Sequence, residues 1–228
     1  MQSSRGLGLI GGLGVGATVH YYQRLVEGCE QLGLTLDIVI TNAHTPQVFE
    51  YVQATDRAGL AEYLNGYIRR MQAAGAEIAA IPAVTPHYCI EELVATSPVQ
   101  IVSIFDPLRD ELARRAIRRA AIFGTRFVIE SDFFGALAGI EIVRPPRDEI
   151  DLIHSTYVEL AAAGKGSPEK RDKLTAVAKT LVQRDQVDAI LLAGTDLTLL
   201  FDESTAEFPC IDCAALHVAE ILKRLSVE

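Results

Sequence analysis

Long apolar runs are missing from this sequence: no stretch approaches the ~18 residues that a membrane-spanning helix needs. The first five residues lack the basic segment, apolar core and cleavage site of a signal peptide. Basic residues are few, with 21 Lys and Arg against 30 Asp and Glu, and a net charge of −9 does not favour nucleic acid as a partner. These absences predict a cytoplasmic protein with no membrane or nucleic-acid partner.

Cysteine is scarce as well. The four cysteines do not make a disulfide framework in a chain of 228 residues. Cys210 and Cys213 form a C-x-x-C motif, but no second Cys/His pair with the spacing of metal ligands lies nearby. We therefore predict no metal site.

Hydrophobic residues make up 49% of the chain, which is enough to bury a substantial core. Two apolar runs, Ile78–His87 and Ile190–Asp196, stop abruptly at Gly or Pro with polar residues just beyond, as buried parallel strands do. In an open α/β sheet the ligand binds outside such carboxyl ends. The polar residues at these two ends are the first candidates for function: Thr85, His87, Thr195 and Asp196.

The chain repeats one α/β pattern. A strand ends in glycine at Gly12 and again at Gly124, and a later strand ends in a threonine-bearing loop at Ala83 and again at Gly194. The two separations agree to within one residue. We predict an α/β fold with two similar doubly wound parallel-sheet domains, related by a pseudo-twofold repeat, and an active-site cleft between them.

The first domain is predicted to comprise residues 1–104, completed by a C-terminal helix within 208–228, and the second to comprise residues 105–207. Thr55 is expected to cap a long helix that runs from Asp56 to Ala74. The polar segment Thr41–Gln47 is expected to be a loop.

A glycine-rich turn follows the first predicted strand. Gly6, Gly8 and Gly11 formally satisfy the dinucleotide-binding pattern G-x-G-x-x-G, but Gly6 and Gly8 fall inside the strand instead of after it. The context therefore does not favour a dinucleotide. We interpret Gly11 to Gly14 as backbone donors to a carboxylate, next to the positive end of a helix dipole.

Five segments carry a family resemblance: IGGLGVGAT at 10–18, AGAEIAAIPAVTPH at 74–87, AAIFGT at 120–125, LLAGTDLTLL at 191–200 and IDCAALH at 211–217. In this order they resemble motifs of the Asp/Glu/hydantoin racemase superfamily, the aspartate/glutamate racemases that use no pyridoxal phosphate. The resemblance implies an amino-acid racemase-type isomerase that acts on a small amino acid or related carboxylate. It also implies a homodimer and no organic cofactor or metal.

The chain departs from this family at the residues that carry the reaction. The family's mechanism places two cysteines on opposite faces of the substrate Cα, and their positions are Ala83 and Gly194 here; Val84 replaces the asparagine that follows the first cysteine. A methyl group and a hydrogen atom carry no proton, so two-cysteine racemisation is not expected at these positions. We interpret Cys89, six residues past Ala83, as a packing thiol instead of a substitute.

Proton transfer would then use groups other than cysteine, and a carboxylate desolvated in a cleft is suited to it. The candidates are Asp196 in place of the family's Glu, His87, His217, or a water held by Thr85 and Thr195. Both histidines can equally be helix-start residues bonded to backbone, and Asp196 can be a helix N-cap. The substrate-binding candidates are Gly11, Gly12, Asn42, Thr45, Val84, Gly124, Thr125, Arg126 and Lys165.

Two classes of function stay open at this point. One is a cofactor-independent isomerase, and the other is a catalytically inactive homologue that binds a carboxylate or an amino acid. They differ in whether a substrate Cα–H exchanges with solvent.

Overall fold

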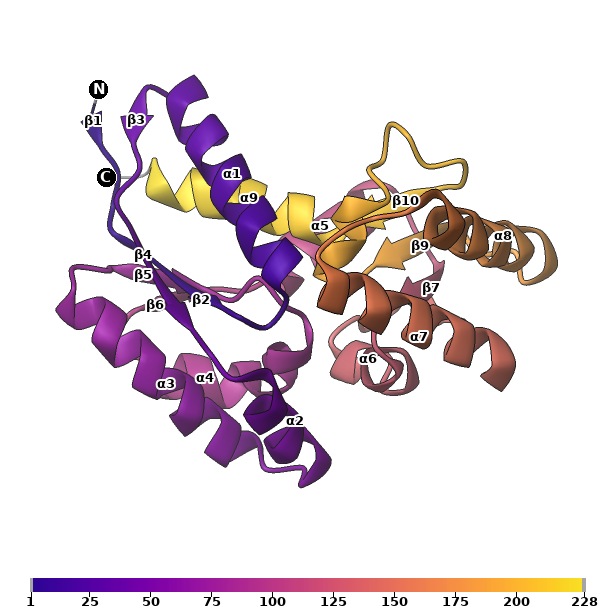
Figure 1. The fold of residues 1–228 in the computed structure, drawn as a ribbon, viewed down its shortest axis with the longest axis horizontal. Coiled ribbons are helices and arrows are strands. Elements are labelled where there is room, and N and C mark those ends of the chain that lie inside the picture. Colours follow the sequence, from indigo (N-terminus) through magenta and orange to yellow (C-terminus); the bar gives the residue numbers. More distant parts are fainter. Residues whose placement is uncertain (1, 227–228) are drawn as a thin grey trace. The chain divides into compact units, whose positions relative to one another are not determined.

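A computed structural model describes residues 2–226 of the protein. The chain divides into two compact units: unit 1 comprises Met1–Ile104 and His217–Glu228, and unit 2 comprises Phe105–Leu216. Each unit contains one four-stranded parallel sheet flanked by helices (Figure 1), which confirms the predicted α/β fold with two similar parallel sheets. Within the described residues, no helix is both long and apolar enough to cross a bilayer.

The sheet of unit 1 has the strand order β4-β2-β5-β6, and every neighbouring pair is parallel. Apolar side chains at positions 60, 64, 68 and 71 form the buried face of its long helix α3, as the helical spacing predicts. Its elements are β1 (Gln2–Ser3), β2 (Leu7–Gly11), α1 (Val15–Gln31), β3 (Leu34–Thr35), β4 (Ile38–Asn42), α2 (Thr45–Gln53), α3 (Arg57–Ala73), β5 (Ile78–Ala80), the short 3-10 helix η1 (Thr85–Cys89), α4 (Ile90–Thr96) and β6 (Gln100–Val102).

The sheet of unit 2 has the strand order β10-β9-β7-β8. In each unit the first long strand, β2 or β7, lies between the second and third strands of its sheet, so both sheets have the same topology. The elements are α5 (Phe105–Arg114), β7 (Arg119–Phe123), α6 (Arg126–Glu130), η2 (Phe133–Gly135), β8 (Glu141–Ile142), α7 (Arg147–Ala163), α8 (Pro168–Arg184), β9 (Ala189–Leu192), η3 (Thr195–Leu199), β10 (Cys210–Asp212) and α9 (Cys213–Leu225), whose residues from 217 on belong to unit 1.

Three details differ from the sequence prediction. Residues 208–216 belong to unit 2 and not to the first domain, because β10 pairs with β9 of the second sheet. Asp56, not Thr55, caps α3, because its carboxylate accepts the Gly59 N–H at 2.8 Å. The expected loop at 41–47 ends early, since Pro46 at the first turn of α2 favours a helix start.

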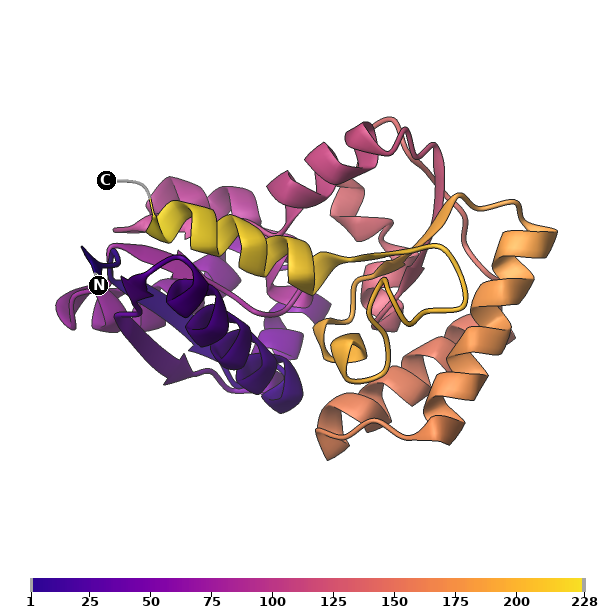
Figure 2. The same ribbon diagram turned by 90° about the horizontal axis from the view of Figure 1, so that it is seen from above.

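The C-terminal helix completes unit 1 by packing on α1. Figure 2 shows the two helices side by side, as does Figure 1. The contact is tight at Gly28, where an added Cβ atom would overlap Leu222. A glycine at this position of α1 therefore lets α9 approach closely.

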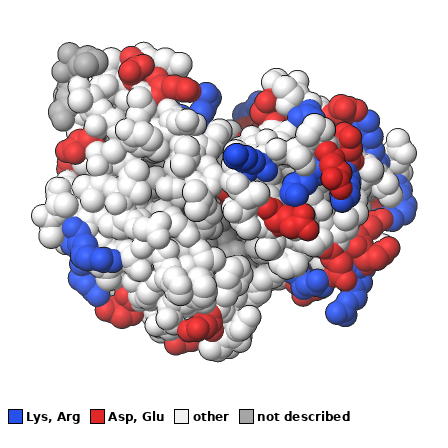
Figure 3. Space-filling view, viewed as in Figure 1, with Lys and Arg blue, Asp and Glu red and all other residues white. Residues whose placement is uncertain are grey.

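Charged side chains are absent from two segments of unit 1, residues 6–23 and residues 38–49. These segments contain β2, β4 and the first half of α1. Figure 3 shows the corresponding face of unit 1, with its charged side chains toward the margins. Any ligand bound at the carboxyl ends of β2 and β4 is therefore met there by dipoles and apolar groups, not by charges from these segments.

Candidate functional site

In unit 1 the carboxyl ends of β2 and β4 bring Gly12, Asn42 and Thr45 together. The Thr45 hydroxyl donates to the Gly12 carbonyl oxygen at 2.7 Å. The Gly12 N–H donates to Thr18 Oγ1 at 3.2 Å, and that hydroxyl donates to the Gly14 carbonyl oxygen at 2.7 Å. The Gly12 N–H is thus used within the loop, and α1 directs the positive end of its dipole at this strand end.

Replacing Gly12 by alanine should destabilise unit 1. Gly12 has φ +83°, and an added Cβ would lie 2.6 Å from the Ala43 backbone oxygen. We expect a loss of about 2 to 3 kcal/mol in the free energy of unfolding, measured by urea denaturation. The matched control is Gly66→Ala in α3, where an added Cβ meets open space, and a gain of up to about 1 kcal/mol is expected. A Gly12→Ala variant as stable as the wild type would contradict this account.

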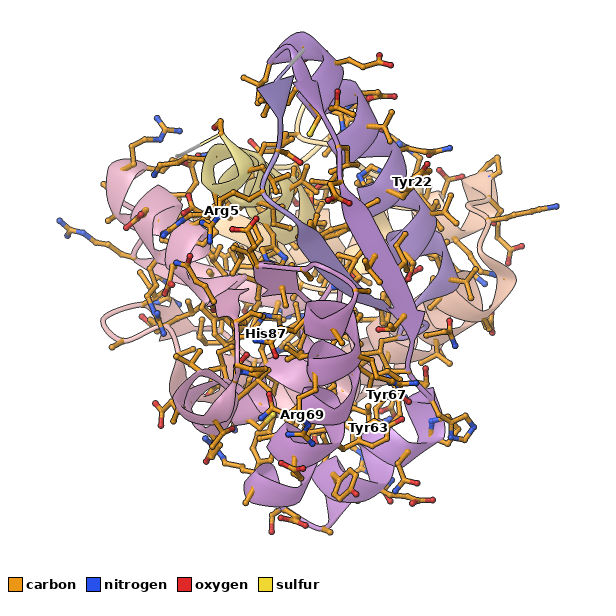
Figure 4. All side chains as sticks on the ribbon, turned by 90° about the vertical axis from the view of Figure 1, so that its left-hand side faces the viewer. Arg5, Tyr22, Tyr63, Tyr67, Arg69 and His87 are labelled. Carbon is orange, nitrogen blue, oxygen red and sulfur yellow. The ribbon has the colours of Figure 1, made fainter. Side chains whose placement is uncertain are left out.

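His87 lies in the interior of unit 1, beyond the end of β5 (Figure 4). Its Nδ1 is 2.8 Å from the Ala83 carbonyl oxygen, and the Ile104 N–H donates to its Nε2 at 3.3 Å. Because Nε2 accepts this bond, Nδ1 carries the proton and donates to Ala83. Burial, with a smaller contribution from His217, lowers the pKa of His87 to about 3, so the ring is neutral.

His217 packs beside His87, with ring centroids 6.0 Å apart. Its Nε2 donates to the Val102 carbonyl oxygen at 2.9 Å, and the Tyr21 hydroxyl donates to its Nδ1 at 3.1 Å. Burial lowers the pKa of His217 to about 4. All four ring nitrogens of the two histidines thus have protein partners, three backbone groups and the Tyr21 hydroxyl, which favours a structural role. His87 lies in η1, whereas His217 is the fifth residue of α9 and not at its start. Their acid/base role stays a prediction.

In unit 2 the carboxyl ends of β7 and β9 bring two glycine turns together. The Gly194 N–H donates to the Phe123 carbonyl oxygen at 2.9 Å, and a Cβ on Gly124 would lie 3.2 Å from the Gly194 nitrogen. Thr125 caps α6 by accepting the Val128 N–H at 3.3 Å. Small residues are therefore required where the two turns meet.

The turn after β9 buries a carboxylate. Asp196 is fully buried and Thr195 nearly so. The hydroxyl of Tyr157, on α7, donates to Asp196 Oδ2 at 3.3 Å. Burial first, and then the Asp196 carboxylate, raise the pKa of Tyr157 well above its ordinary range, so Tyr157 is a hydrogen-bond donor at neutral pH.

Two cations were predicted to bind substrate from unit 2. The Arg126 guanidinium is paired with Asp151, at 2.5 Å between Nη1 and Oδ1, which neutralises much of its charge. Lys165 is exposed in the turn between α7 and α8. The neighbouring Gly166 packs against the Leu199 carbonyl oxygen at the end of η3, so this turn lies over the segment that carries Asp196.

The sequence matches the model of the Asp/Glu/hydantoin racemase family over residues 10–221. The chain belongs to this racemase family. The family resemblance inferred from the five sequence segments is thereby confirmed.

Several racemase structures share the fold. An aspartate racemase homologue from Pyrococcus horikoshii OT3 is 21% identical, with 98% of this chain and 100% of that chain covered and a TM-score of 0.80. The Picrophilus torridus aspartate racemase is 20% identical, with 98% and 94% covered and a TM-score of 0.76. An allantoin racemase from Klebsiella pneumoniae is 14% identical, with 99% and 87% covered and a TM-score of 0.61. These likenesses establish the racemase fold.

The cysteines of this racemase-family member are all buried and unpaired. Burial raises the pKa of Cys89 and Cys210 to about 12 and raises the pKa of Cys213 well above its usual value, so these thiols keep their protons at neutral pH. In the described part of the chain, no group of three or more His, Cys, Asp or Glu side chains is arranged to hold a metal ion.

The predicted site residues fall into two sets, each at the carboxyl edge of its own sheet. The set in unit 1 is Gly11, Gly12, Asn42, Thr45, Ala83, Val84, Thr85, His87 and His217. The set in unit 2 is Gly124, Thr125, Arg126, Lys165, Gly194, Thr195 and Asp196.

Sequence reasoning missed Tyr157 and His154, both on α7. His154 Nδ1 accepts the Arg126 N–H at 3.2 Å, next to the Thr125 turn. Tyr157 falls in the buried stripe formed by Ile150, Ile153 and Leu160. A tyrosine in such a stripe is typical of an ordinary core position, so only the contact with Asp196 distinguishes it.

Proposed function

We propose that the protein is a cofactor-independent, racemase-type isomerase that acts on a small amino acid or a related carboxylate. Family membership supports the reaction class. Groups other than cysteine would carry the proton, because Ala83 and Gly194 stand where the family resemblance puts the two cysteines. Structural neighbours are named for aspartate and for allantoin, so an amino acid and a hydantoin ring both belong in a substrate panel.

The observation that carries this proposal is the buried carboxylate of Asp196. It stands just past the carboxyl end of β9, where open α/β sheets bind their ligands. A positioned carboxylate can take the proton from a substrate Cα–H as a general base, and a second group that delivers a proton to the opposite face of Cα would complete the inversion. Asp196 is therefore the proposed proton carrier of unit 2.

In unit 1 the strand ends are suited to holding the substrate carboxylate by dipoles. Gly12, Asn42 and Thr45 form a compact polar cluster, and the N-terminus of α1 points at it. Residues 6–23 and 38–49 contain no Asp, Glu, Lys or Arg, so the α1 dipole and polar groups, not acidic or basic side chains, would do the binding. In unit 2 the exposed Lys165 is the candidate cation.

One observation favours the second candidate function, a non-catalytic carboxylate-binding protein. Racemisation needs a proton removed on one face of Cα and returned on the other. The two imidazoles of unit 1 already bond to Ala83, Ile104, Val102 and Tyr21. Neither imidazole therefore has a ring nitrogen left to hold a substrate proton.

The two functions are separated by proton NMR in D2O. The purified protein is incubated with L- and D-aspartate, L- and D-glutamate, other amino acids and allantoin, and each compound's α-proton signal and enantiomeric composition are followed. We expect loss of the α-proton signal together with inversion for at least one compound.

Loss of the α-proton signal without a change in enantiomeric composition would show a base on only one face of Cα and would reject racemisation. No exchange across the panel, with compounds still shifting the protein's own resonances, would reject the isomerase and support the binding protein. A heat-inactivated sample serves as the control for non-enzymatic exchange.

A further inference from the structure

The ring of Tyr157 occupies the space that a side chain at position 194 would need. An added Cβ on Gly194 would overlap Cε2 of this ring and lie 2.6 Å from Cδ2 and 2.8 Å from Cζ. The glycine and the tyrosine are therefore sterically coupled: one can be large only because the other is small. Position 194 is also where the family resemblance places the second cysteine.

The hydroxyl of Tyr157 ends on the turn that carries the proposed proton carrier. It donates to Asp196 Oδ2 at 3.3 Å, and it also interacts with the Thr195 side chain and the Asp196 backbone N–H. The tyrosine side chain spans from α7 to η3 and is 8% exposed. One rigid aromatic side chain thus both fills the space beside Gly194 and fixes the carboxylate two residues later.

We propose that Tyr157 is the positioning residue for Asp196 and that it has taken over the space of the missing side chain at position 194. This inference rests on the proposed function. A hydroxyl that donates to a carboxylate favours the ionised form, which is the form able to take a proton. The bond also restricts rotation of the carboxylate, which keeps its oxygens at a fixed orientation.

The proton balance of the step is simple. The substrate Cα–H bond breaks, an O–H bond forms on the Asp196 carboxylate, and the electron pair stays on the substrate as a carbanion conjugated with its carbonyl group. The Tyr157 proton stays on the phenol oxygen throughout. Return of the proton from Asp196 to the same face of Cα restores the carboxylate and gives exchange without inversion, whereas inversion needs a proton delivered to the opposite face by a second group.

The variant that tests this inference is Tyr157→Phe, which keeps the ring beside Gly194 and removes only the hydroxyl. We expect the exchange rate kcat to fall about 10- to 100-fold with KM nearly unchanged. The acid limb of the pH–rate profile should move upward by about one pH unit, because the carboxylate loses a donor.

A second readout is independent of catalysis. The Asp196 carboxyl carbon, labelled with 13C and assigned by its absence from Asp196→Asn, is titrated by NMR in the wild type and in Tyr157→Phe. The midpoint should rise in the variant. The matched control is Tyr21→Phe, which removes another buried tyrosine hydroxyl, the one bonded to His217 in unit 1, and should leave the Asp196 midpoint unchanged.

An unchanged midpoint in Tyr157→Phe would overturn the inference, even if the variant were less active or less stable. If the wild type exchanges no α-proton but the midpoint still rises, the proposed isomerase fails while Tyr157 remains the residue that orients Asp196. Failure of the function and failure of the positioning role are therefore distinguishable.

Discussion

Substitution of Asp196 by asparagine should reduce α-proton exchange at least about 1,000-fold, to the background of the assay. Asparagine has nearly the same shape, and its amide oxygen can still accept the Tyr157 hydroxyl. It cannot hold a proton taken from a substrate. The fold should therefore be kept while the reaction is lost, and the NMR exchange assay in D2O with the best substrate measures the effect.

The chain offers a matched control for this variant in Asp212→Asn. Asp212 is also a buried aspartate of unit 2, but its carboxylate accepts the Ala214 and Ala215 N–H groups and so caps α9. Asparagine caps a helix about as well as aspartate, so this replacement should change stability little and leave exchange intact. Wild-type exchange in Asp196→Asn would remove Asp196 from the mechanism.

Mild acid should unfold unit 1 through its two buried histidines. An unfolded histidine has a pKa of ~6.5, whereas burial holds the pKa of His87 at about 3 and that of His217 at about 4. The unfolded state therefore binds more protons than the folded state below pH 6.5. Their contribution to stability is complete above this pH and is lost as the pH falls from 6.5 toward 4.

Linkage puts this loss at about 3 kcal/mol per histidine between pH 7 and pH 4. Hydrogen exchange read by mass spectrometry, peptide by peptide, should show α1 and β2 losing protection over this range. In unit 2 burial raises the pKa of Asp212 to about 6. This shift acts in the opposite direction, because the contribution of Asp212 to the free energy of unfolding falls as the pH rises through that value.

The variant His217→Gln tests this assignment. It removes one titrating group and should be less stable than the wild type at pH 7 but less sensitive to acid. A wild-type pH slope in His217→Gln would mean that other groups cause the acid unfolding of unit 1.

Strand ends were the part of the site that the sequence predicted well. Gly12, Gly124 and Asp196 each follow a buried parallel strand, and apolar runs that stop at Gly or Pro locate such ends without any knowledge of tertiary structure. The same rule placed both sheets.

Hydrogen-bond partners from distant segments could not be predicted from the sequence. The bonds of His217 come from Tyr21 and Val102, and the contact of Tyr157 is with Asp196, so no local pattern marks either one. The prediction of the α3 cap was wrong for a local reason. Thr55 and Asp56 are both good capping residues, and only the backbone geometry shows that Asp56 is the cap.

Unit 1 is discontinuous, because residues 217–225 complete a unit whose other elements lie before residue 105. A chain is synthesised from its amino terminus, and domains fold as their residues emerge. The sheet of unit 1 therefore leaves the ribosome first but waits through the synthesis of all of unit 2 for α9. During that time Tyr21 and Val102 lack their partner His217, and the surface of α1 at Gly28 lacks Leu222. The order of synthesis is thus the reverse of the order of completion, and a nascent chain interrupted before residue 217 would carry a finished second unit behind an unfinished first one.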